Sequence, residues 1–307
     1  MRMAILDMGT NTFNVLVRDP DDVRYEFSDK IPVRLGEGGF GTGRISEAAL
    51  ERARQALISL VALAHDQGAT LIEALATSAV RDASNGHELV EWAHRVLGLN
   101  IEVIDGIREA QYILEGVRHA VELPEEPVLV VDIGGGSTEI LLARGSETVW
   151  MKSYPLGVSR LKELFQPLDP LNSEDQARLH EHFSTHFDGL TTELRRHRPR
   201  WLIGSSGSFD TLADLVRVPP GSPEVWSPSE PIAPDSALAM CVLLQQLPLE
   251  ERLGLPGMAT FRAELMGISA LLVQHLLELH PFEHFVLSRF ALKEGVYFSR
   301  QAAYRAL

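Results

Sequence analysis

Two short segments of this sequence resemble each other, and this internal repeat constrains the fold more than any other feature. The first is AILDMGTNT at residues 4–12, and the second is LVVDIGGGST at residues 129–138. In each segment an apolar run ends in Asp-x-Gly, a turn of small residues follows, and the chain then becomes apolar again. This order is typical of a buried strand, a tight turn and a second strand. The sequence therefore predicts two copies of one α/β lobe.

The length of the chain agrees with two lobes. A chain of 307 residues fits two domains of about 150 residues each, and a hydrophobic content of 45% supplies both with a core. The prolines between 124 and 127 are interpreted as a hinge, so we predict a first lobe over 1–123 and a second over 124–290. Within these lobes we also expect a strand over 31–35, one long polar helix over 173–198 and a proline-rich loop over 219–234.

The charge of the chain argues against several classes of partner. The sequence has 42 acidic and 28 basic residues, a formal net charge of −14 at pH 7, which disfavours binding to nucleic acid and to anionic membranes. No apolar run reaches the roughly 18 residues of a membrane-spanning helix, and Met1-Arg2-Met3 leads into a strand without the layout of a signal peptide. The single cysteine, Cys241, forms no intramolecular disulfide. We therefore expect a cytoplasmic protein that binds neither nucleic acid nor membranes.

The second Asp-x-Gly turn has the composition of a phosphate-binding loop. A turn of small residues directs several backbone N–H groups into one concavity, where phosphate oxygens bind at little steric cost. Asp132 precedes this turn and Glu139 follows it, so two carboxylates are expected where a hydrated Mg²⁺ can bridge protein and phosphate. The candidate phosphate-binding residues of this turn are Gly134, Gly135, Gly136, Ser137 and Thr138.

The first turn repeats this chemistry in part. A single Asp-x-Gly turn is more often an ordinary hairpin, but two copies at corresponding positions favour a shared kind of ligand. The candidate phosphate-binding residues of the first turn are Asp7, Gly9, Thr10 and Asn11.

Two further charged residues are candidates for catalysis. Glu109 lies in the first turn of a helix that follows Asp105-Gly106, a position that suits a base that orients water. The alternative for Glu109 is an ordinary acid at a helix N-terminus, where the helix dipole favours it. Arg81 follows a strand that ends in two hydroxyl residues, an arrangement that can hold a phosphoryl group from one side. The alternative for Arg81 is a surface residue beside an N-cap.

Two other glycine-rich segments have weaker functional interpretations. Residues 36–41 satisfy G-x-G-x-x-G, but they do not follow the first strand of a lobe, which argues against dinucleotide binding. A nucleophile elbow around Ser206 would need glycine at position 208, where this chain has serine. We therefore interpret Ser206 and Gly207 as a further contact to phosphate or as part of a turn.

Five blocks of the sequence, taken in order, resemble the signature blocks of a known family. They are DMGTNT at 7–12, ATSAVR at 76–81, GIREA at 106–110, VDIGGGSTE at 131–139 and GSSG at 204–207. Together they resemble the exopolyphosphatase/guanosine pentaphosphate phosphatase (Ppx/GppA) family. The resemblance implies an α/β fold of the actin-like ATPase (acetate and sugar kinase/heat-shock protein/actin) superfamily, with two ribonuclease-H-like lobes and a cleft between them. It also implies that a C-terminal helix over 291–307 completes the first lobe.

The same resemblance assigns roles to the candidate residues. It matches Glu109 to the general base of the family, and it matches Asp132 and Glu139 to the metal-binding and water-positioning carboxylates. Arg81 and the two turns match the phosphate contacts. The implied cofactor is Mg²⁺, with Mn²⁺ as a second candidate, and the implied reaction is in-line attack of water on a terminal phosphoryl group. A homodimer is left open.

Four functions are compatible with this set of residues. The leading one is an exopolyphosphatase that releases orthophosphate from inorganic polyphosphate, and the alternative is a hydrolase of the 5′ γ-phosphate of guanosine pentaphosphate. An ATP-dependent kinase or ATPase of the same fold ranks lower, because Glu109 favours water as the acceptor. A non-catalytic sensor of polyphosphate or of the alarmone also ranks lower, because all three carboxylates are present. Asn14 and Arg108 depart from the common pattern of the family, and both bear on substrate preference.

Overall fold

The computed structural model describes residues 2–22, 24, 26–217 and 227–305. The chain divides into two compact units: unit 1 contains Met1–Gly116 and Ala291–Leu307, and unit 2 contains Val117–Phe290. The division falls inside a helix, whereas the sequence analysis placed it at the prolines that begin at 124. No helix in the described ranges is long and apolar enough to cross a lipid bilayer.

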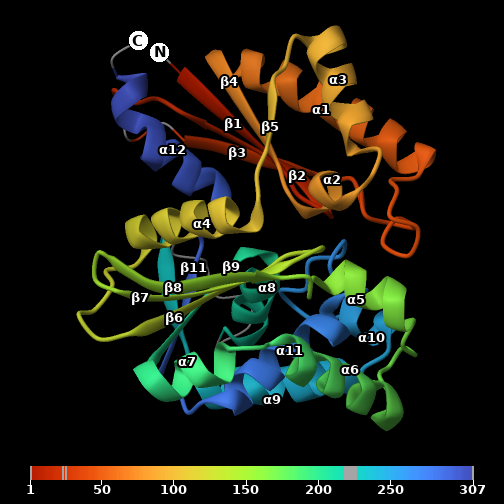
Figure 1. Ribbon diagram of the computed structural model, residues 1–307, viewed down its shortest axis with the longest axis vertical. Helices are drawn as coiled ribbons and strands as arrows, with labels where there is room; N and C mark the ends of the chain where they lie inside the picture. The colour runs from red at the N-terminus through yellow and green to blue at the C-terminus, as the bar shows by residue number, and fades with distance from the viewer. Residues whose placement is uncertain (1, 23, 25, 218–226, 306–307) are drawn as a thin grey trace. The chain divides into compact units, whose positions relative to one another are not determined.

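Unit 1 is built on a five-stranded sheet with the strand order β3-β2-β1-β4-β5. The strands are β1 (Arg2–Met8), β2 (Thr12–Arg18), β3 (Glu26–Pro32), β4 (Ala69–Ala76) and β5 (Ile101–Val103). The pairs β1/β2 and β2/β3 are antiparallel, and the pairs β1/β4 and β4/β5 are parallel. The helices are α1 (Glu47–Asp66), α2 (Ser78–Asp82), α3 (Gly86–Leu97), the first part of α4 (Gly106–Ala120) and α12 (Leu292–Tyr304) (Figure 1).

The helix α1 follows directly from local sequence. The side chain of Ser46 accepts a hydrogen bond from the N–H of Ala49 and so caps the helix. The apolar face of α1 is buried in one core with Leu6 and Met8 of β1. Because successive side chains of a strand point to opposite faces, Asp7 lies on the face of the sheet that α1 does not cover.

The last helix, α12, packs against β1 and β2 of unit 1. It also approaches α4 closely, because a Cβ atom at Gly295 would lie 1.7 Å from the backbone oxygen of Tyr112. The guanidinium of Arg300 donates hydrogen bonds to Glu102 (2.7 Å) and to the Tyr112 hydroxyl (2.9 Å). The C-terminal segment is therefore an integral part of unit 1.

Unit 2 is built on a six-stranded sheet with the order β10-β11-β9-β6-β7-β8. The strands are β6 (Val128–Ile133), β7 (Thr138–Arg144), β8 (Glu147–Tyr154), β9 (Trp201–Ser205), β10 (Ser229–Ile232) and β11 (His284–Ser288). The helices are α5 (Val158–Phe165), α6 (Ser173–His186), α7 (Leu190–His197), α8 (Ser206–Val216), α9 (Pro234–Gln246), α10 (Leu249–Leu253) and α11 (Met266–Leu279).

The two sheets share one topology. In unit 2 the series β8-β7-β6-β9-β11 corresponds to β3-β2-β1-β4-β5 of unit 1. The directions agree as well, since β6/β7 and β7/β8 are antiparallel and β6/β9 and β9/β11 are parallel. Strand β10 is an additional edge strand, antiparallel to β11. The predicted repeat is thus confirmed, as is the α/β fold with two ribonuclease-H-like lobes.

One face of the unit 2 sheet carries the main core. Leu129, Val131 and Ile133 of β6 are buried together with apolar side chains of α6, α9 and α11, and Figure 1 shows these helices on the same side of the sheet. By the alternation of side chains along a strand, Asp132 lies on the opposite face. The aspartate that precedes each turn therefore points away from the main helical core of its own unit.

Three details of the predicted secondary structure are wrong. The strand expected over 31–35 is β3, which spans Glu26–Pro32. The long helix expected over 173–198 is two helices, α6 and α7, separated at Gly189, whose φ of 81° interrupts helical geometry. The loop expected over 219–234 contains β10 and the start of α9 in its described part, and 218–226 lie outside the described residues.

Candidate active site

Asp132 and Glu139 are neighbours across two strands of unit 2. They face each other in the register of β6 and β7, and both side chains are buried, with 5% and 1% of their surface exposed. Carboxylates are rarely this buried unless they are paired, hydrogen-bonded or bound to a metal. The structure thus places together the two residues that the sequence analysis assigned to a metal.

Serine hydroxyls bind both carboxylates. The hydroxyls of Ser205 and Ser206 donate to the same oxygen of Asp132, Oδ2, at 2.8 and 2.6 Å. The hydroxyl of Ser153 donates to Oε1 of Glu139 at 2.7 Å. Each carboxylate therefore has one oxygen held by protein hydroxyl groups.

The glycine-rich turn of unit 2 presents backbone donors. The carbonyl groups of Gly134 and Gly135 accept hydrogen bonds from the first N–H groups of α5, at 2.9–3.1 Å, and the carbonyl of Gly136 accepts one from Arg160 Nε at 2.8 Å. The N–H groups of Gly135, Gly136 and Ser137 make no hydrogen bond within the described ranges. With its carbonyls turned toward α5, this turn has the form of an anion-binding nest.

Close packing explains why this turn needs a glycine partner. A Cβ atom at Gly157, just before α5, would lie 2.3 Å from backbone atoms of Gly135 and Gly136. Thr138, at the end of the turn, donates its hydroxyl to the carbonyl of Leu156 at 2.9 Å. The hydroxyl of Thr138 thus stabilises the turn, and its predicted contact to phosphate stays a prediction.

The segment at Ser206 and Gly207 stands at the start of α8. Besides its bond to Asp132, Ser206 has a φ of 67° in the left-handed region. The carbonyl of Gly207 accepts a hydrogen bond from Arg262 Nη1 at 2.7 Å, and a Cβ atom at Gly207 would meet the guanidinium at 2.3 Å. Ser206 therefore bonds to a candidate metal ligand, and the phosphate contacts of both residues stay predictions.

The turn of unit 1 is built in the same way. The N–H of Gly9 bonds to the carbonyl of Thr12 at 3.1 Å, as that of Gly134 bonds to Ser137 at 3.0 Å. The carbonyls of Thr10 and Asn11 accept hydrogen bonds from the N–H groups of the segment 33–36. Both turns thus use their carbonyl groups to bind the following part of their own unit.

The strand positions beside the two turns differ in charge. In unit 1 the residue in register with Asp7 is Asn14, and the next in the row is Lys30. The amide of Asn14 donates to Asp7 Oδ2 at 2.9 Å. The corresponding row of unit 2 has two adjacent carboxylates, so unit 2 offers the better ligands for a divalent cation.

Glu109 and Arg81 form an ion pair in unit 1. Glu109 lies in the first turn of α4, with 7% of its surface exposed. Nη1 of Arg81 donates to Glu109 Oε2 at 2.9 Å and to the carbonyl of Ile104 at 3.0 Å. Glu109 is thus a buried carboxylate held by an arginine and not an exposed acid at a helix terminus, and its role as the base stays a prediction.

The donor set of unit 2 suits Mg²⁺. In the described part of the chain no group of three or more His, Cys, Asp or Glu side chains could hold a metal ion. Mg²⁺ is commonly bound by one or two carboxylates together with waters and substrate phosphates rather than by a cage of protein ligands. Asp132 and Glu139 supply such a pair, next to the nest that would hold the phosphates.

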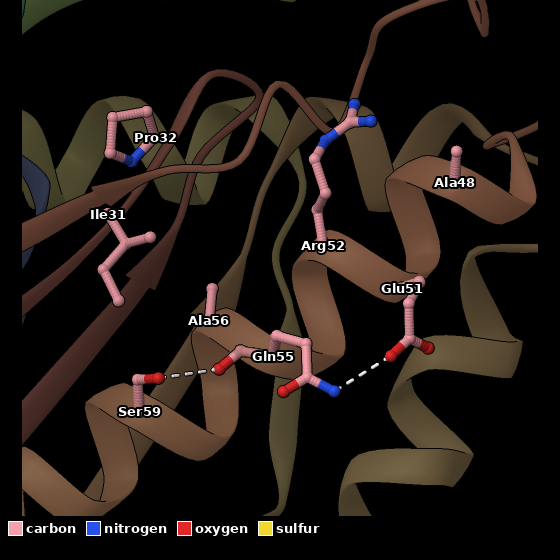
Figure 2. Close-up of a pocket in the computed structure, with 8 residues that line it drawn as sticks. All are labelled: Ile31, Pro32, Ala48, Glu51, Arg52, Gln55, Ala56 and Ser59. Atoms are coloured by element: carbon pink, nitrogen blue, oxygen red, sulfur yellow. Dashed lines mark hydrogen bonds between the residues drawn. The ribbon is translucent and has the colours of Figure 1, made fainter.

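A shallow groove on unit 1 does not include these residues. It has a volume of about 580 Å³ and lies between β3 and α1. Figure 2 shows its lining, which consists of Ile31, Pro32, Ala48, Glu51, Arg52, Gln55, Ala56 and Ser59. No predicted site residue is among them, so the groove is not the candidate active site.

Several residues of the site were missed by sequence reasoning. Ser153, Gly157 and Arg160 follow no motif, and they reach the site through strand register and the start of α5. Ser205 lies inside the GSSG block, but its bond to Asp132 depends on the parallel pairing of β6 and β9. Ser153 could have been found from the sequence only by predicting a third strand after the hairpin of β6 and β7 and by pairing that strand with β7.

Comparison with known proteins identifies the family of this chain. The model of the Ppx/GppA phosphatase family matches residues 20–303. Exopolyphosphatase 1 of Mycobacterium leprae is 25% identical over 303 residues, which cover 96% of this chain and 88% of that protein. Exopolyphosphatase 1 of Mycobacterium tuberculosis is 26% identical over 302 residues, with coverage of 96% and 87%.

Solved structures give the same result. An exopolyphosphatase from Cytophaga hutchinsonii is similar with a TM-score of 0.94 and 32% identity, covering 99% of this chain and 98% of that one. The Aquifex aeolicus member of the Ppx/GppA family is similar with a TM-score of 0.77 and 26% identity, with the same coverage of 99% and 98%. The fold, the two turns and the match over nearly all of its length show that this chain belongs to the Ppx/GppA phosphatase family.

Proposed function

We propose that this protein is an exopolyphosphatase, which hydrolyses the terminal phosphoanhydride bond of inorganic polyphosphate and releases orthophosphate. The observation that carries the proposal is the nest of N–H groups at 135–137 beside the paired carboxylates Asp132 and Glu139. Backbone donors and a carboxylate pair are what a phosphate chain with a divalent cation requires. The relatives from Mycobacterium and Cytophaga that carry the name exopolyphosphatase support polyphosphate as the substrate.

In this proposal the residues of unit 2 bind the phosphoryl group. The N–H groups of Gly135, Gly136 and Ser137 donate to its oxygens and stabilise the charge that these oxygens carry in the transition state. Asp132 and Glu139 would hold Mg²⁺, with Mn²⁺ as the second candidate, and the cation would supply positive charge that neutralises the phosphate chain. Catalysis then comes mainly from positioning and from charge neutralisation.

Glu109 is the proposed general base. Its carboxylate orients the attacking water and accepts the proton as the new bond to phosphorus forms. Arg81 holds Oε2 of Glu109 through Nη1, which fixes the direction of the carboxylate. The oxygen of the leaving phosphate departs in line with the attacking water.

Guanosine pentaphosphate is the alternative substrate, because removal of its 5′ γ-phosphate needs the same catalytic groups. The test is Mg²⁺-dependent release of phosphate from polyphosphates of graded length and from guanosine pentaphosphate. Glu109→Gln should lower kcat by about 10² or more, since a positioned base contributes about 10²–10⁴. Glu115→Gln, on the same helix, is the matched control and should keep activity near that of the wild type.

The outcomes separate the alternatives. Release of phosphate from polyphosphate that depends on Glu109 supports the proposal. If phosphate is released faster from guanosine pentaphosphate than from polyphosphate, guanosine pentaphosphate is the substrate instead. If the Glu109→Gln variant keeps its activity, Glu109 is not the general base. Transfer of phosphate from ATP to an acceptor, without hydrolysis of either compound, would show a kinase, and ligand binding with no turnover would show a sensor.

A further inference from the structure

Six polar residues form one row across the whole sheet of unit 2. Strand register places in this row Ser229 of β10, Ser288 of β11, Ser205 of β9, Asp132 of β6, Glu139 of β7 and Ser153 of β8. Residues in register on neighbouring strands point to the same face of the sheet. The two carboxylates therefore stand in the middle of the row, with a serine next to each of them.

The serines next to the carboxylates direct their hydroxyls to them. Ser153 donates to Glu139, and Ser205 donates to Asp132. Ser288, one position further along, donates instead to the carbonyl of Phe290 at 2.7 Å. The hydroxyl bonds to carboxylate thus occur at the two positions that flank the carboxylate pair and not along the row as a whole.

Ser206 adds a second hydroxyl to Asp132 at a conformational cost. Its φ of 67° lies in the left-handed region that residues with a Cβ atom avoid. In this conformation its hydroxyl reaches Oδ2 of Asp132 at 2.6 Å, the oxygen that Ser205 also binds. Strained backbone that is retained beside polar groups of a site is a common sign of function.

We propose that Ser153, Ser205 and Ser206 are positioning residues that set the orientation of Asp132 and Glu139 for Mg²⁺. The inference rests on the proposed function, because it takes these two carboxylates as the ligands of the cation. The terminal torsion of a carboxylate side chain is soft and broad. A hydroxyl that holds one oxygen fixes the plane of the carboxylate and hence the direction of its second oxygen.

The row of unit 1 has no such arrangement. Its aspartate, Asp7, is in register with Asn14 on one side and with Leu75 on the other. The groups that flank it are an amide and an aliphatic side chain, and the next residue in the row is Lys30. Serine hydroxyls therefore accompany the unit that has the carboxylate pair, as expected if they serve the metal ligands.

The test measures binding of Mn²⁺, a paramagnetic substitute for Mg²⁺, to the full chain by electron paramagnetic resonance of the free ion. The titration is done with the protein alone, because a phosphate analogue in excess would itself bind Mn²⁺. Partners of metal ligands typically change metal affinity by about 10–100-fold. Ser153→Ala and the double change Ser205→Ala with Ser206→Ala should each weaken Mn²⁺ binding by about tenfold or more.

Three variants separate positioning from folding. Ser153→Thr keeps a hydroxyl at the same place and should bind Mn²⁺ within about threefold of the wild type, since its bond to Glu139 can still form. Ser206→Gly loses the hydroxyl but accepts a φ of 67° without strain, so its thermal stability should be kept while Mn²⁺ binding weakens. Ser288→Ala removes a buried hydroxyl of the same row that touches no carboxylate, and it should bind Mn²⁺ like the wild type.

Activity gives a second readout. In the serine variants the Mg²⁺ concentration that gives the half-maximal rate should rise by about the same factor by which Mn²⁺ binding is weakened. Saturating Mg²⁺ should restore most of kcat. Unchanged Mn²⁺ affinity in Ser153→Ala and in the double variant would overturn the inference, and so would equal weakening in Ser288→Ala.

Failure of the proposed function looks different. Glu139→Gln and Asp132→Asn should each abolish Mn²⁺ binding if these residues are the ligands. If both variants bind Mn²⁺ as well as the wild type, the metal assignment itself is wrong and the inference falls with it. If they lose binding while the serine variants keep it, the metal assignment stands and the role of the serines alone is refuted.

Discussion

Among single residues, Arg81 is placed to act through Glu109. One nitrogen of its guanidinium donates both to Glu109 Oε2 and to the carbonyl of Ile104, and Nε pairs with Asp82 at 3.3 Å. A lysine cannot reproduce this set of directions, because its ammonium is a point charge on a flexible stem.

We predict that Arg81→Lys lowers kcat by about tenfold or more, since the base loses its fixed orientation. KM should change much less if Arg81 acts only through Glu109. Steady-state kinetics with polyphosphate, beside an Arg95→Lys control on the exposed side of α3, provide the measurement. A rise in KM with kcat kept would instead show that Arg81 contacts the phosphate chain directly.

At the scale of elements, the start of α5 supports the phosphate-binding turn. Gly157→Ala would place a Cβ atom 2.3 Å from the backbone of Gly135 and Gly136, so either the helix or the turn must move. We expect a loss of about 1–3 kcal/mol in stability, as for other overpacked sites, together with a higher KM for polyphosphate.

Gly254→Ala is the matched control for Gly157→Ala. A Cβ atom there would lie 3.4 Å from the carbonyl oxygen of Glu251, an ordinary contact. Thermal denaturation and kinetics of both variants make the comparison. Full activity and stability in Gly157→Ala would show that the turn adapts without cost.

The helices α6 and α11 contain a pair of histidines that we expect to make the stability of the protein depend on pH. Nδ1 of His275 lies 3.0 Å from Nδ1 of His180. Burial, followed by the nearby His180, lowers the pKa of His275 from 6.5 to about 4, against a small opposing effect of Glu278. Because the folded pKa lies below the unfolded one, the unfolded chain binds the proton first, and stability is lost as the pH falls from 6.5 towards 4.

We expect this loss to reach about 3 kcal/mol when the pH approaches the folded pKa of His275. His275→Gln should remove most of it. The exposed His87→Gln, on α3, should keep the pH dependence of the wild type. Urea denaturation near pH 7 and near pH 5 measures the difference, and an equal slope in wild type and His275→Gln would contradict the prediction.

At the scale of the whole molecule, residues from both ends of the chain make up unit 1. The contact of α12 with α4 depends on Gly295, where an added Cβ atom would overlap the backbone oxygen of Tyr112 at 1.7 Å. Gly295→Ala should therefore destabilise unit 1 by about 3 kcal/mol or more, since backbone rather than a flexible side chain has to move.

Calorimetry can locate that effect. Since the chain has two compact units, the transition of unit 1 should move to a lower temperature while that of unit 2 stays. Ala302→Ser, at an exposed position of α12, should leave both transitions in place. An unchanged profile in Gly295→Ala would show that α12 contributes little to unit 1.

Local patterns explain some elements of the fold and fail at others. The helix α1 follows from its cap at Ser46 and its apolar periodicity, which act within one element. Strand β3 is an exposed edge strand of mixed polarity, so hydrophobicity pointed to the wrong residues. The break between α6 and α7 depends on the left-handed Gly189, a conformation that a helical pattern of side chains does not reveal.

Some features of the candidate site could likewise be predicted from the sequence, and others could not. By itself the sequence determined the repeated Asp-x-Gly turns, the carboxylates beside the second turn and the place of Glu109 at the start of a helix, because each depends on residues close together in the chain. Only the tertiary structure decided that Ser153 and Ser205 flank the carboxylates and that α5 binds the carbonyls of the turn. These contacts depend on the register between strands and on the packing of helices that are distant in sequence, and neither is encoded in any short pattern of residues.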